Sequence, residues 1–163
     1  MIPVKIKLNG GMMPQKQHDD DAAFDVFAPE DVELSYGRQL INLRFALELP
    51  KGYAATIQPR SGFSFKGVEV ARILFDNEEI VVTKERIDAD VIRGLIDAGY
   101  RGEVRVILKV NKVFSPSMKY ILKKGTRIAQ MQIIKVPEVE LIEAEELSET
   151  GRGEGGIGST GVK

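Results

Sequence analysis

Apolar and polar residues alternate along several short segments of this chain. The alternation is clearest at residues 4–8, 44–49, 103–110 and 127–134. A period of two is typical of a strand with one buried face. The turn Pro50-Lys51-Gly52 separates the second segment from residues 53–57, which follow as its hairpin partner. We therefore predict a strand at each of these five segments.

A further hairpin is predicted from residues 69–75 and 79–83, which flank the turn-forming pair Asp76-Asn77. Helical periodicity is nearly absent, and we expect at most one helical turn at 64–67 and another at 143–147. Short strands between Gly- and Pro-containing turns indicate an all-β fold, a sandwich or a jelly roll. We expect one β domain over residues 1–147 and a flexible, glycine-rich C-terminal segment over 148–163.

Composition excludes several classes of function. The 163 residues carry a net charge of −1 with mixed signs, so no basic stripe indicates a nucleic-acid partner. The chain has no cysteine, which excludes disulfides, thiol nucleophiles and cysteine zinc sites. The single histidine, His18, argues against a histidine metal cage or a serine–histidine triad. No apolar run approaches the ~20 residues that span a bilayer, and no signal peptide is evident, so we expect a cytoplasmic protein without membrane contact.

Five segments are too polar or too rich in glycine for the strands beside them. In the first, 21–26, Asp25 lies between Phe24 and Val26. A carboxylate in this setting is either buried and hydrogen-bonded, or directed at a cation through water. The alternative is a loop aspartate that caps a turn. The preceding run His18–Asp21 is interpreted as a solvated loop and not as a metal site.

The second and third segments offer groups for an anion and for a reacting water. Pro59-Arg60-Ser61-Gly62 combines donors for anionic oxygen with a glycine that permits close backbone contact. In the segment 94–102, Asp97 could orient a water and Tyr100 could present its ring to a sugar or base. The alternative for this segment is a plain β-hairpin with Asp97 at its corner.

The fourth and fifth segments add further phosphate-binding chemistry. In 125–131 strict alternation places Arg127, Ala129 and Met131 on one face and Gln130 on the other, where a buried Gln130 would need hydrogen-bond partners. Gln130 at a subunit or sheet contact is the alternative. Five of the ten residues 152–161 are glycine, and Arg152 with Ser159-Thr160 suits a polyphosphate. A flexible linker is the alternative there.

In this order the five segments resemble the motifs of the trimeric dUTP pyrophosphatases (dUTPases). The matching segments are Ala23–Val26, Pro59–Gly62, Gly94–Gly102, Gly125–Gln130 and Arg152–Gly161, which span nearly the whole chain. The resemblance implies a distorted jelly-roll fold, also called a β-clip. It also implies a homotrimer in which each site takes its third motif from one subunit and its first, second and fourth from another. The third subunit supplies the C-terminal tail as a lid.

The resemblance also implies a reaction, in which dUTP and water give dUMP and pyrophosphate with Mg²⁺. This reaction limits uracil incorporation into DNA and supplies dUMP for dTMP synthesis. The implied catalytic residues are Asp97 as general base, Arg60, Gln130 and Arg152. The implied substrate contacts are Ser61, Gly62, Gly94, Ile96, Tyr100, Arg105, Ile157, Gly158, Ser159 and Thr160. Asp25 would hold the metal through water.

Two departures from the family pattern concern the lid and an insertion. Ile157 stands where the family usually has phenylalanine over the uracil, so we expect a weaker lid. Ser61 precedes Asp97 by 36 positions, well over a dozen more than in compact members. The extra segment, around 69–90, is interpreted as a surface insertion. A site rim, a trimer contact or a protein-partner surface are its alternatives.

Two rival functions are weaker on sequence grounds. The related dCTP deaminases carry a catalytic glutamate where this chain has Ile107, so attack at the base would lack its proton shuttle. A regulatory protein that uses the nucleotide as a switch, as phage-borne members suggest, would use the inserted hairpin. The catalytic side chains are nevertheless all present, which favours hydrolysis.

Overall fold

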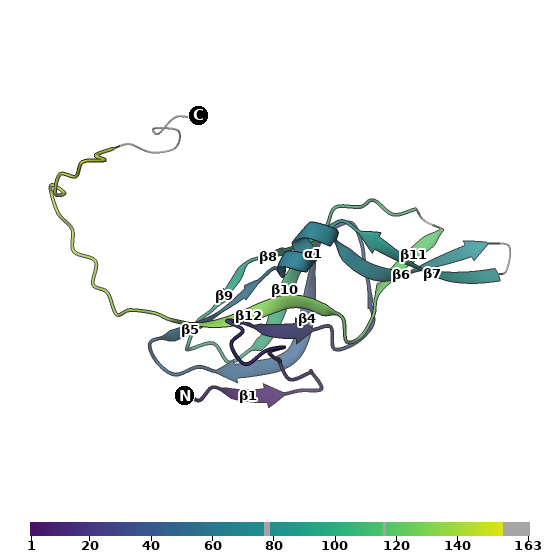
Figure 1. Ribbon diagram of the computed structural model, residues 1–163, viewed down its shortest axis with the longest axis horizontal. Coiled ribbons are helices and arrows are strands. Elements are labelled where there is room, and N and C mark those ends of the chain that lie inside the picture. Colours follow the sequence, from purple (N-terminus) through teal and green to yellow (C-terminus); the bar gives the residue numbers. More distant parts are fainter. Residues whose placement is uncertain (77–78, 116, 155–163) are drawn as a thin grey trace.

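The regular structure of this protein is almost entirely β, as the sequence predicts (Figure 1). The computed structural model describes residues 1–76, 79–115 and 117–154. Within these ranges the strands form three four-stranded sheets, and all their pairings are antiparallel. No helix in the described ranges is long and apolar enough to cross a bilayer.

The first sheet contains the longest strand, β4. Its strands are β1 (Lys5–Leu8), β4 (Gly37–Glu48), β10 (Glu103–Val110) and β8 (Ala89–Ile92), in that order. Alternate residues of β4 and β10 are buried, among them Leu43, Phe45 and Leu108. A bulge interrupts β4 opposite β10, where Arg44 adopts a left-handed φ of 54°. The Arg44 carbonyl accepts hydrogen bonds from the N–H groups of Asn9 and Gly11, which fixes the turn after β1.

The second sheet carries parts of the first, third and fourth motifs, and the second motif directly follows one of its strands. Its order is β2 (Phe24–Phe27), β12 (Arg127–Lys135), β5 (Tyr53–Gln58) and β9 (Gly94–Ile96). Val26, Ile57 and Ile128 are buried in the core that this sheet shares with the first. The chemistry-bearing residues of these motifs therefore lie on, or close after, strands that the core holds in place.

The third sheet includes the predicted hairpin. Its order is β3 (Val32–Glu33), β11 (Met118–Leu122), β6 (Val68–Asp76) and β7 (Glu79–Ile87). Strands β6 and β7 pair in register from Val68–Ile87 to Asp76–Glu79, so the hairpin is confirmed and is longer than predicted. It extends from one end of the molecule, with β7 at the sheet edge (Figure 1).

A short helix, α1 (Ser61–Lys66), joins β5 to this hairpin. It starts three residues before the predicted helical turn and buries Phe63. It ends at Gly67, whose φ is 70° and where an added Cβ would lie 2.3 Å from the Ile87 carbonyl oxygen. Only glycine allows this crossing, so Gly67 brings the base of the hairpin directly against α1.

The segment that follows β12 leaves the body of the molecule (Figure 1). Its apolar residues Val139, Leu141, Ile142 and Leu147 are all exposed. The helical turn expected at 143–147 is wrong, since these residues form no helix. Without apolar neighbours to pack against, so short a stretch cannot offset the conformational entropy that is lost when a helix forms.

Candidate functional site

Three neighbouring strands bring the first, second and fourth motifs together. Gln130 in β12 pairs with Asp25 in β2 on one side and with Gln58 in β5 on the other. Arg60 follows β5 after Pro59. These residues line a hollow of about 430 Å³, with the loop 17–23 at its rim. We call it the Asp25 hollow.

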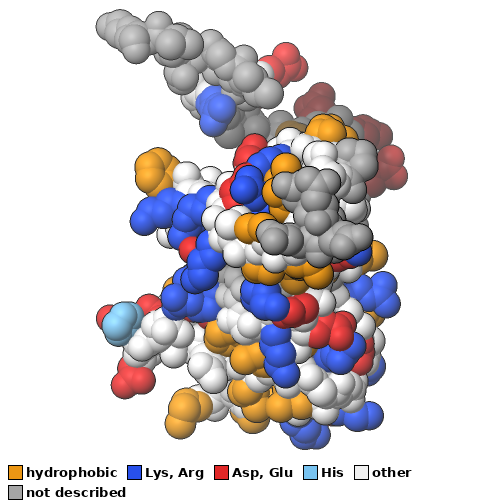
Figure 2. Space-filling model, turned by 90° about the vertical axis from the view of Figure 1, so that its right-hand side faces the viewer, with side chains coloured by type: hydrophobic (Ala, Val, Ile, Leu, Met, Phe, Trp, Pro, Cys, Tyr) orange, Lys and Arg blue, Asp and Glu red, His pale blue; other side chains and the backbone are white. Residues whose placement is uncertain are grey.

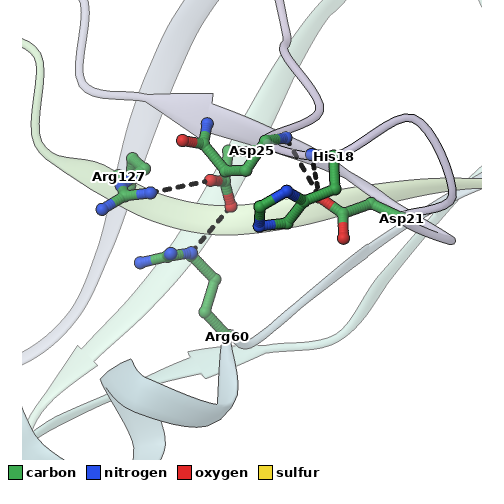
Figure 3. A network of polar contacts seen from close by, with 6 residues as sticks. His18, Asp21, Asp25, Arg60 and Arg127 are labelled. Atoms are coloured by element: carbon green, nitrogen blue, oxygen red, sulfur yellow. Dashed lines mark hydrogen bonds and ion pairs between the residues drawn. The ribbon is translucent and has the colours of Figure 1, made fainter.

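Asp25 is the buried centre of this hollow, with only 4% of its surface exposed. The Nε atom of Arg60 donates to its Oδ1 at 2.7 Å, and Nη1 of Arg127 to its Oδ2 at 3.4 Å (Figure 3). A buried carboxylate requires such compensation. The prediction that Asp25 is buried and hydrogen-bonded is confirmed, and the turn-capping alternative is wrong. The ion pairs hold the Arg60 guanidinium at the edge of the hollow.

Arg127 is the functional residue that the sequence did not single out. Strict alternation assigned it to the face of Ala129 and Met131, and this assignment is wrong. A register shift between Arg127 and Ala129 pairs Arg127 with Phe27, which lies on the same face of β2 as Asp25. A bulge adds one residue and so moves a side chain to the other face.

The loop at the rim is closed by Asp21. Its Oδ2 accepts hydrogen bonds from the backbone N–H groups of His18, at 2.9 Å, and Gln17, at 3.0 Å (Figure 3). The hydrogen bond from His18 is the main cause that lowers the pKa of Asp21. His18 and Asp21 both line the Asp25 hollow. No group of three or more His, Cys, Asp or Glu residues in the described parts of the chain is arranged to hold a metal.

The second motif turns from strand to helix at Arg60. The Arg60 carbonyl accepts hydrogen bonds from the N–H groups of Phe63 and Ser64, at 3.0 and 2.9 Å. Ser61 and Gly62 are exposed on the first turn. Their place beside Arg60 leaves the hydroxyl and the backbone of this turn accessible to a ligand.

The third motif forms a separate hollow of about 250 Å³ between β9 and β10, which we call the Tyr100 hollow. Its lining includes all five residues predicted from this motif, namely Gly94, Ile96, Asp97, Tyr100 and Arg105. Ile107, at the place of the deaminase glutamate, also lines it. The plain β-hairpin alternative is wrong, because β9 pairs with β5 whereas β10 pairs with β4 and β8 in another sheet. Asp97 is exposed in the turn that connects the two sheets.

Tyr100 is held against its own turn. Its hydroxyl donates to the Glu103 carbonyl at 3.1 Å, and its N–H donates to the Asp97 carbonyl at 3.0 Å. A Cβ added to Gly102 would lie 2.4 Å from the Tyr100 Oη atom. Glycine at position 102 therefore lets the ring fold back over the turn and form one wall of the hollow.

One chain does not bring Asp97 and Arg60 together. Ile96 pairs with Ala55, whereas Arg60 lies five positions further along the chain, beyond the other end of β5. At about 3.3 Å per strand residue the separation is roughly 15 Å or more. Within one chain, Asp97 and Arg60 therefore line different hollows.

The tail motif is described only in part. Arg152 is exposed and is not among the residues that line either hollow. The predicted contacts Ile157, Gly158, Ser159 and Thr160 lie outside the described residues.

Comparison with known proteins identifies one family. The family model described as dUTPase matches residues 9–80 and 83–161, with a break inside β7. A deoxyuridine 5'-triphosphate nucleotidohydrolase from Hydrogenobaculum sp. (strain Y04AAS1) is 40% identical over 145 residues, covering 87% of this chain and 85% of the relative. One from Mycobacterium tuberculosis (strain H37Rv) is 34% identical, covering 96% and 92%.

A solved structure shares the fold closely. The Staphylococcus bacteriophage 80alpha dUTPase with dUpNHpp superposes with a TM-score of 0.77 at 28% identity, covering 98% of this chain and 99% of that one. That work describes phage dUTPases as controlling transfer of virulence genes by a proto-oncogenic G protein-like mechanism.

Proposed function

Because this chain belongs to the dUTPase family, we propose that it hydrolyses dUTP to dUMP and pyrophosphate. In a cell this reaction limits uracil incorporation into DNA and supplies dUMP for dTMP synthesis. The observation that carries the proposal is the Tyr100 hollow, where a narrow cleft for a base and sugar has an exposed carboxylate, Asp97, at its corner. A cytoplasmic location stays a prediction.

The segment 94–102 accounts for selection of the nucleoside. Tyr100, fixed by its hydrogen bond to Glu103, packs under the deoxyribose and leaves no room for a 2′-hydroxyl. Ile96 lines the sugar pocket, and main-chain groups around Gly94 and near Arg105 read the uracil edge. Cytosine presents the wrong donors and acceptors, so it would leave buried groups unpaired. The same segment fits closely around the base and excludes the methyl group of thymine.

Asp97 acts as general base in this proposal. It accepts a proton from a water whose oxygen attacks the α-phosphorus in line, and the bond from that phosphorus to the β-phosphate oxygen breaks. Pyrophosphate leaves. Ser61, Gly62 and Gln130 hold phosphate oxygens, while Arg60 supplies positive charge from a position that Asp25 fixes.

The tail closes the site. Arg152 and the residues Ile157, Gly158, Ser159 and Thr160 clamp the terminal phosphate and cover the base, which excludes bulk water. The exposed position of Arg152, in a segment that leaves the body, supports a tail that reaches a site on another copy.

The Asp25 hollow fits Mg²⁺ held through water better than direct coordination. Both Asp25 oxygens face arginines, and Asp21 Oδ2 accepts two backbone N–H groups. Direct ligation would break these contacts, whereas the remaining carboxylate lone pairs can accept from a metal-bound water. The metal, held mainly by the triphosphate, neutralises phosphate charge when it is bound.

The proposed reaction also implies that the protein forms a homotrimer with shared sites. The roughly 15 Å between Asp97 and Arg60 along one sheet calls for a second copy to complete each site. Three-fold symmetry would place the Tyr100 hollow of one subunit against the Asp25 hollow of the next, and the tail of the third would close over both.

A substrate panel tests the proposal. We expect rapid pyrophosphate release from dUTP with Mg²⁺ and little from dCTP, dTTP or UTP. Ammonia release from dCTP would instead establish a deaminase, and binding of dUTP without turnover would contradict hydrolysis.

A partner-binding role for the hairpin β6–β7 is a second candidate. Ile80, Val81 and Val82 of its edge strand are exposed, and an exposed apolar edge strand is a ready surface for another protein. A nucleotide-dependent change in partner binding that survives Asp97→Asn would support this role, and binding that ignores the nucleotide would contradict it.

A further inference from the structure

A third hollow, of about 380 Å³, lies at the base of the hairpin β6–β7 beside α1. Four basic side chains line it, Arg60, Lys66, Arg86 and Arg127, against one carboxylate, Glu69. Figure 2 shows basic side chains gathered on the side of the molecule above His18. We call this depression the Arg86 hollow, because Arg86 is its contribution from the inserted hairpin. Such a concentration of positive charge in a concave surface favours an anion.

The position of Arg86 is fixed by the second motif. Gly67 at the end of α1 touches the Ile87 carbonyl, and Val68 and Ile87 form the first, buried pair of the hairpin. Arg86 is the next residue along β7, and its Nη1 donates to the Gly67 carbonyl at 3.3 Å. The guanidinium is therefore tied to the same turn that begins with Arg60.

Glu69 neutralises the positive charge of Arg86 only in part. Its Oε1 lies 3.2 Å from Nζ of Lys84, whereas its Oε2 lies 4.0 Å from Nη2 of Arg86. The closer partner of this carboxylate is thus Lys84. A guanidinium has five N–H groups in a planar fork that suits phosphate, and an anion in the hollow would complete its contacts.

The Arg86 hollow adjoins the Asp25 hollow at Arg60. Arg60 lines both, and Asp25 pairs with the two arginines, Arg60 and Arg127, that the Arg86 hollow includes. A triphosphate that is held at Gln130 and extends past Arg60 would reach the Arg86 hollow.

We propose that Arg86, with Lys66, forms a subsite for the terminal phosphates of the substrate and for the pyrophosphate product. The inference rests on the proposed hydrolysis, since it assigns the far end of the same triphosphate. It gives the inserted hairpin a direct part in binding, through its base and not its tip.

Calorimetric titration of the Arg86→Ala variant tests this subsite. The probes are the imido analogue dUpNHpp, dUMP and inorganic pyrophosphate. We expect dUpNHpp and pyrophosphate to bind about five- to tenfold more weakly, as for one partly exposed charge-assisted hydrogen bond. Affinity for dUMP, which lacks the terminal phosphates, should be unchanged. Lys66→Ala, on α1 instead of the hairpin, should act in the same direction.

Lys84→Ala is the matched control. Lys84 and Arg86 lie two residues apart on one face of β7, and both pair with Glu69, but Lys84 does not line the hollow. The control should bind all three probes as the unaltered protein does. Equal melting temperatures would show that both variants fold, and Arg86→Lys should restore part of the affinity.

Several results would overturn the subsite. They are unchanged dUpNHpp and pyrophosphate binding in Arg86→Ala, an equal loss of dUMP affinity, or an equal loss in Lys84→Ala. Turnover of dUTP by the unaltered protein separates this failure from failure of the proposed function. If dUTP is not hydrolysed, the pyrophosphate titration still decides the subsite, because it needs no nucleoside.

Discussion

The Asp25 hollow and the Tyr100 hollow are assembled in different ways. In the first, three adjacent strands place the groups, and two arginines pair with a buried carboxylate within one chain. In the second, the short connection between β9 and β10 holds Tyr100 against its own turn and leaves Asp97 exposed. The comparison teaches that one folded subunit organises the anion-binding charge, whereas it keeps the proposed base in a separate hollow, which the proposed trimer would bring to the phosphate.

Asp97→Asn should produce the largest effect. The amide keeps the shape of the side chain but takes up no proton, so we expect kcat to fall by about 10³-fold. Pyrophosphate release measures this change. The affinity for dUpNHpp should stay close to that of the unaltered protein, because the amide keeps the size and a hydrogen-bonding oxygen of the Asp97 side chain. A kcat near the original value would remove Asp97 from the reaction.

Mixing two inactive variants tests whether the hollows combine across subunits. Asp97→Asn and Arg60→Ala chains, unfolded and refolded together in equal amounts, should recover activity at about a quarter of the sites. Each recovered site takes an intact Asp97 from one chain and an intact Arg60 from the other. If both groups act within a single chain, the mixture stays as inactive as its components.

Asp25→Asn should lower stability where Asp97→Asn does not. The change leaves Arg60 and Arg127 beside a neutral amide, and we expect a loss of about 2 kcal/mol in the free energy of unfolding. The arginines retain some solvent exposure, which keeps the loss below that of a fully buried pair. Urea denaturation followed by circular dichroism, at equal protein concentration, measures both variants. Equal midpoints would show that the ion pairs contribute little to stability.

Gly102→Ala should disturb the Tyr100 hollow alone. The new methyl group would displace the Tyr100 ring, so we expect KM for dUTP to rise about tenfold, near 1.4 kcal/mol. Discrimination against UTP should weaken with it. Gly99→Ala is the control from the same turn, since a Cβ there meets nothing within 4 Å. Equal KM values for both variants would mean that the ring position does not set affinity.

The smallest effect concerns Glu103, at the start of β10. Hydrogen bonds from the side chains of Asn42 and Asn9 lower its pKa below the ordinary value of 4.5. Its stabilising contribution is therefore complete above pH 4.5 and is lost as the pH falls below 4.5 and through the lowered pKa. The stability advantage over Glu103→Gln, read from urea midpoints between pH 7 and pH 3, should shrink in that window. An advantage that is constant with pH would contradict this.

The sequence predicts most of the long strands and most of the polar residues of both hollows. It does not predict features that depend on contacts between distant segments. Long alternating segments such as 103–110 are recovered almost to the residue. Short strands escape because two to five residues cannot display a period, and the missed strands are β2, β3, β8, β9 and β11. The first half of β4 escapes as well, since the apolar Leu40 lies on its exposed face and Gly37 and Gln39 lie on the other.

The missed site residues have a common cause. Arg127 depends on a bulge that shifts the register of β12, and Arg86 depends on the crossing at Gly67, which brings two distant segments into contact. Neither event leaves a pattern in the residues themselves. The separation of Asp97 from Arg60 likewise follows from strand register, which a motif order does not contain.

The pairing of Val68 with Ile87 has a consequence for the history and the engineering of this chain. Paired residues in antiparallel strands have their Cα atoms about 5 Å apart, so the hairpin enters and leaves the fold at one point. The whole segment 68–87 can then be inserted or deleted as a unit. A tight turn is sufficient to join the chain ends that a deletion leaves. A foreign peptide or a fluorescent reporter could be inserted at the same point of the chain. It would then lie beside the polyphosphate end of the site.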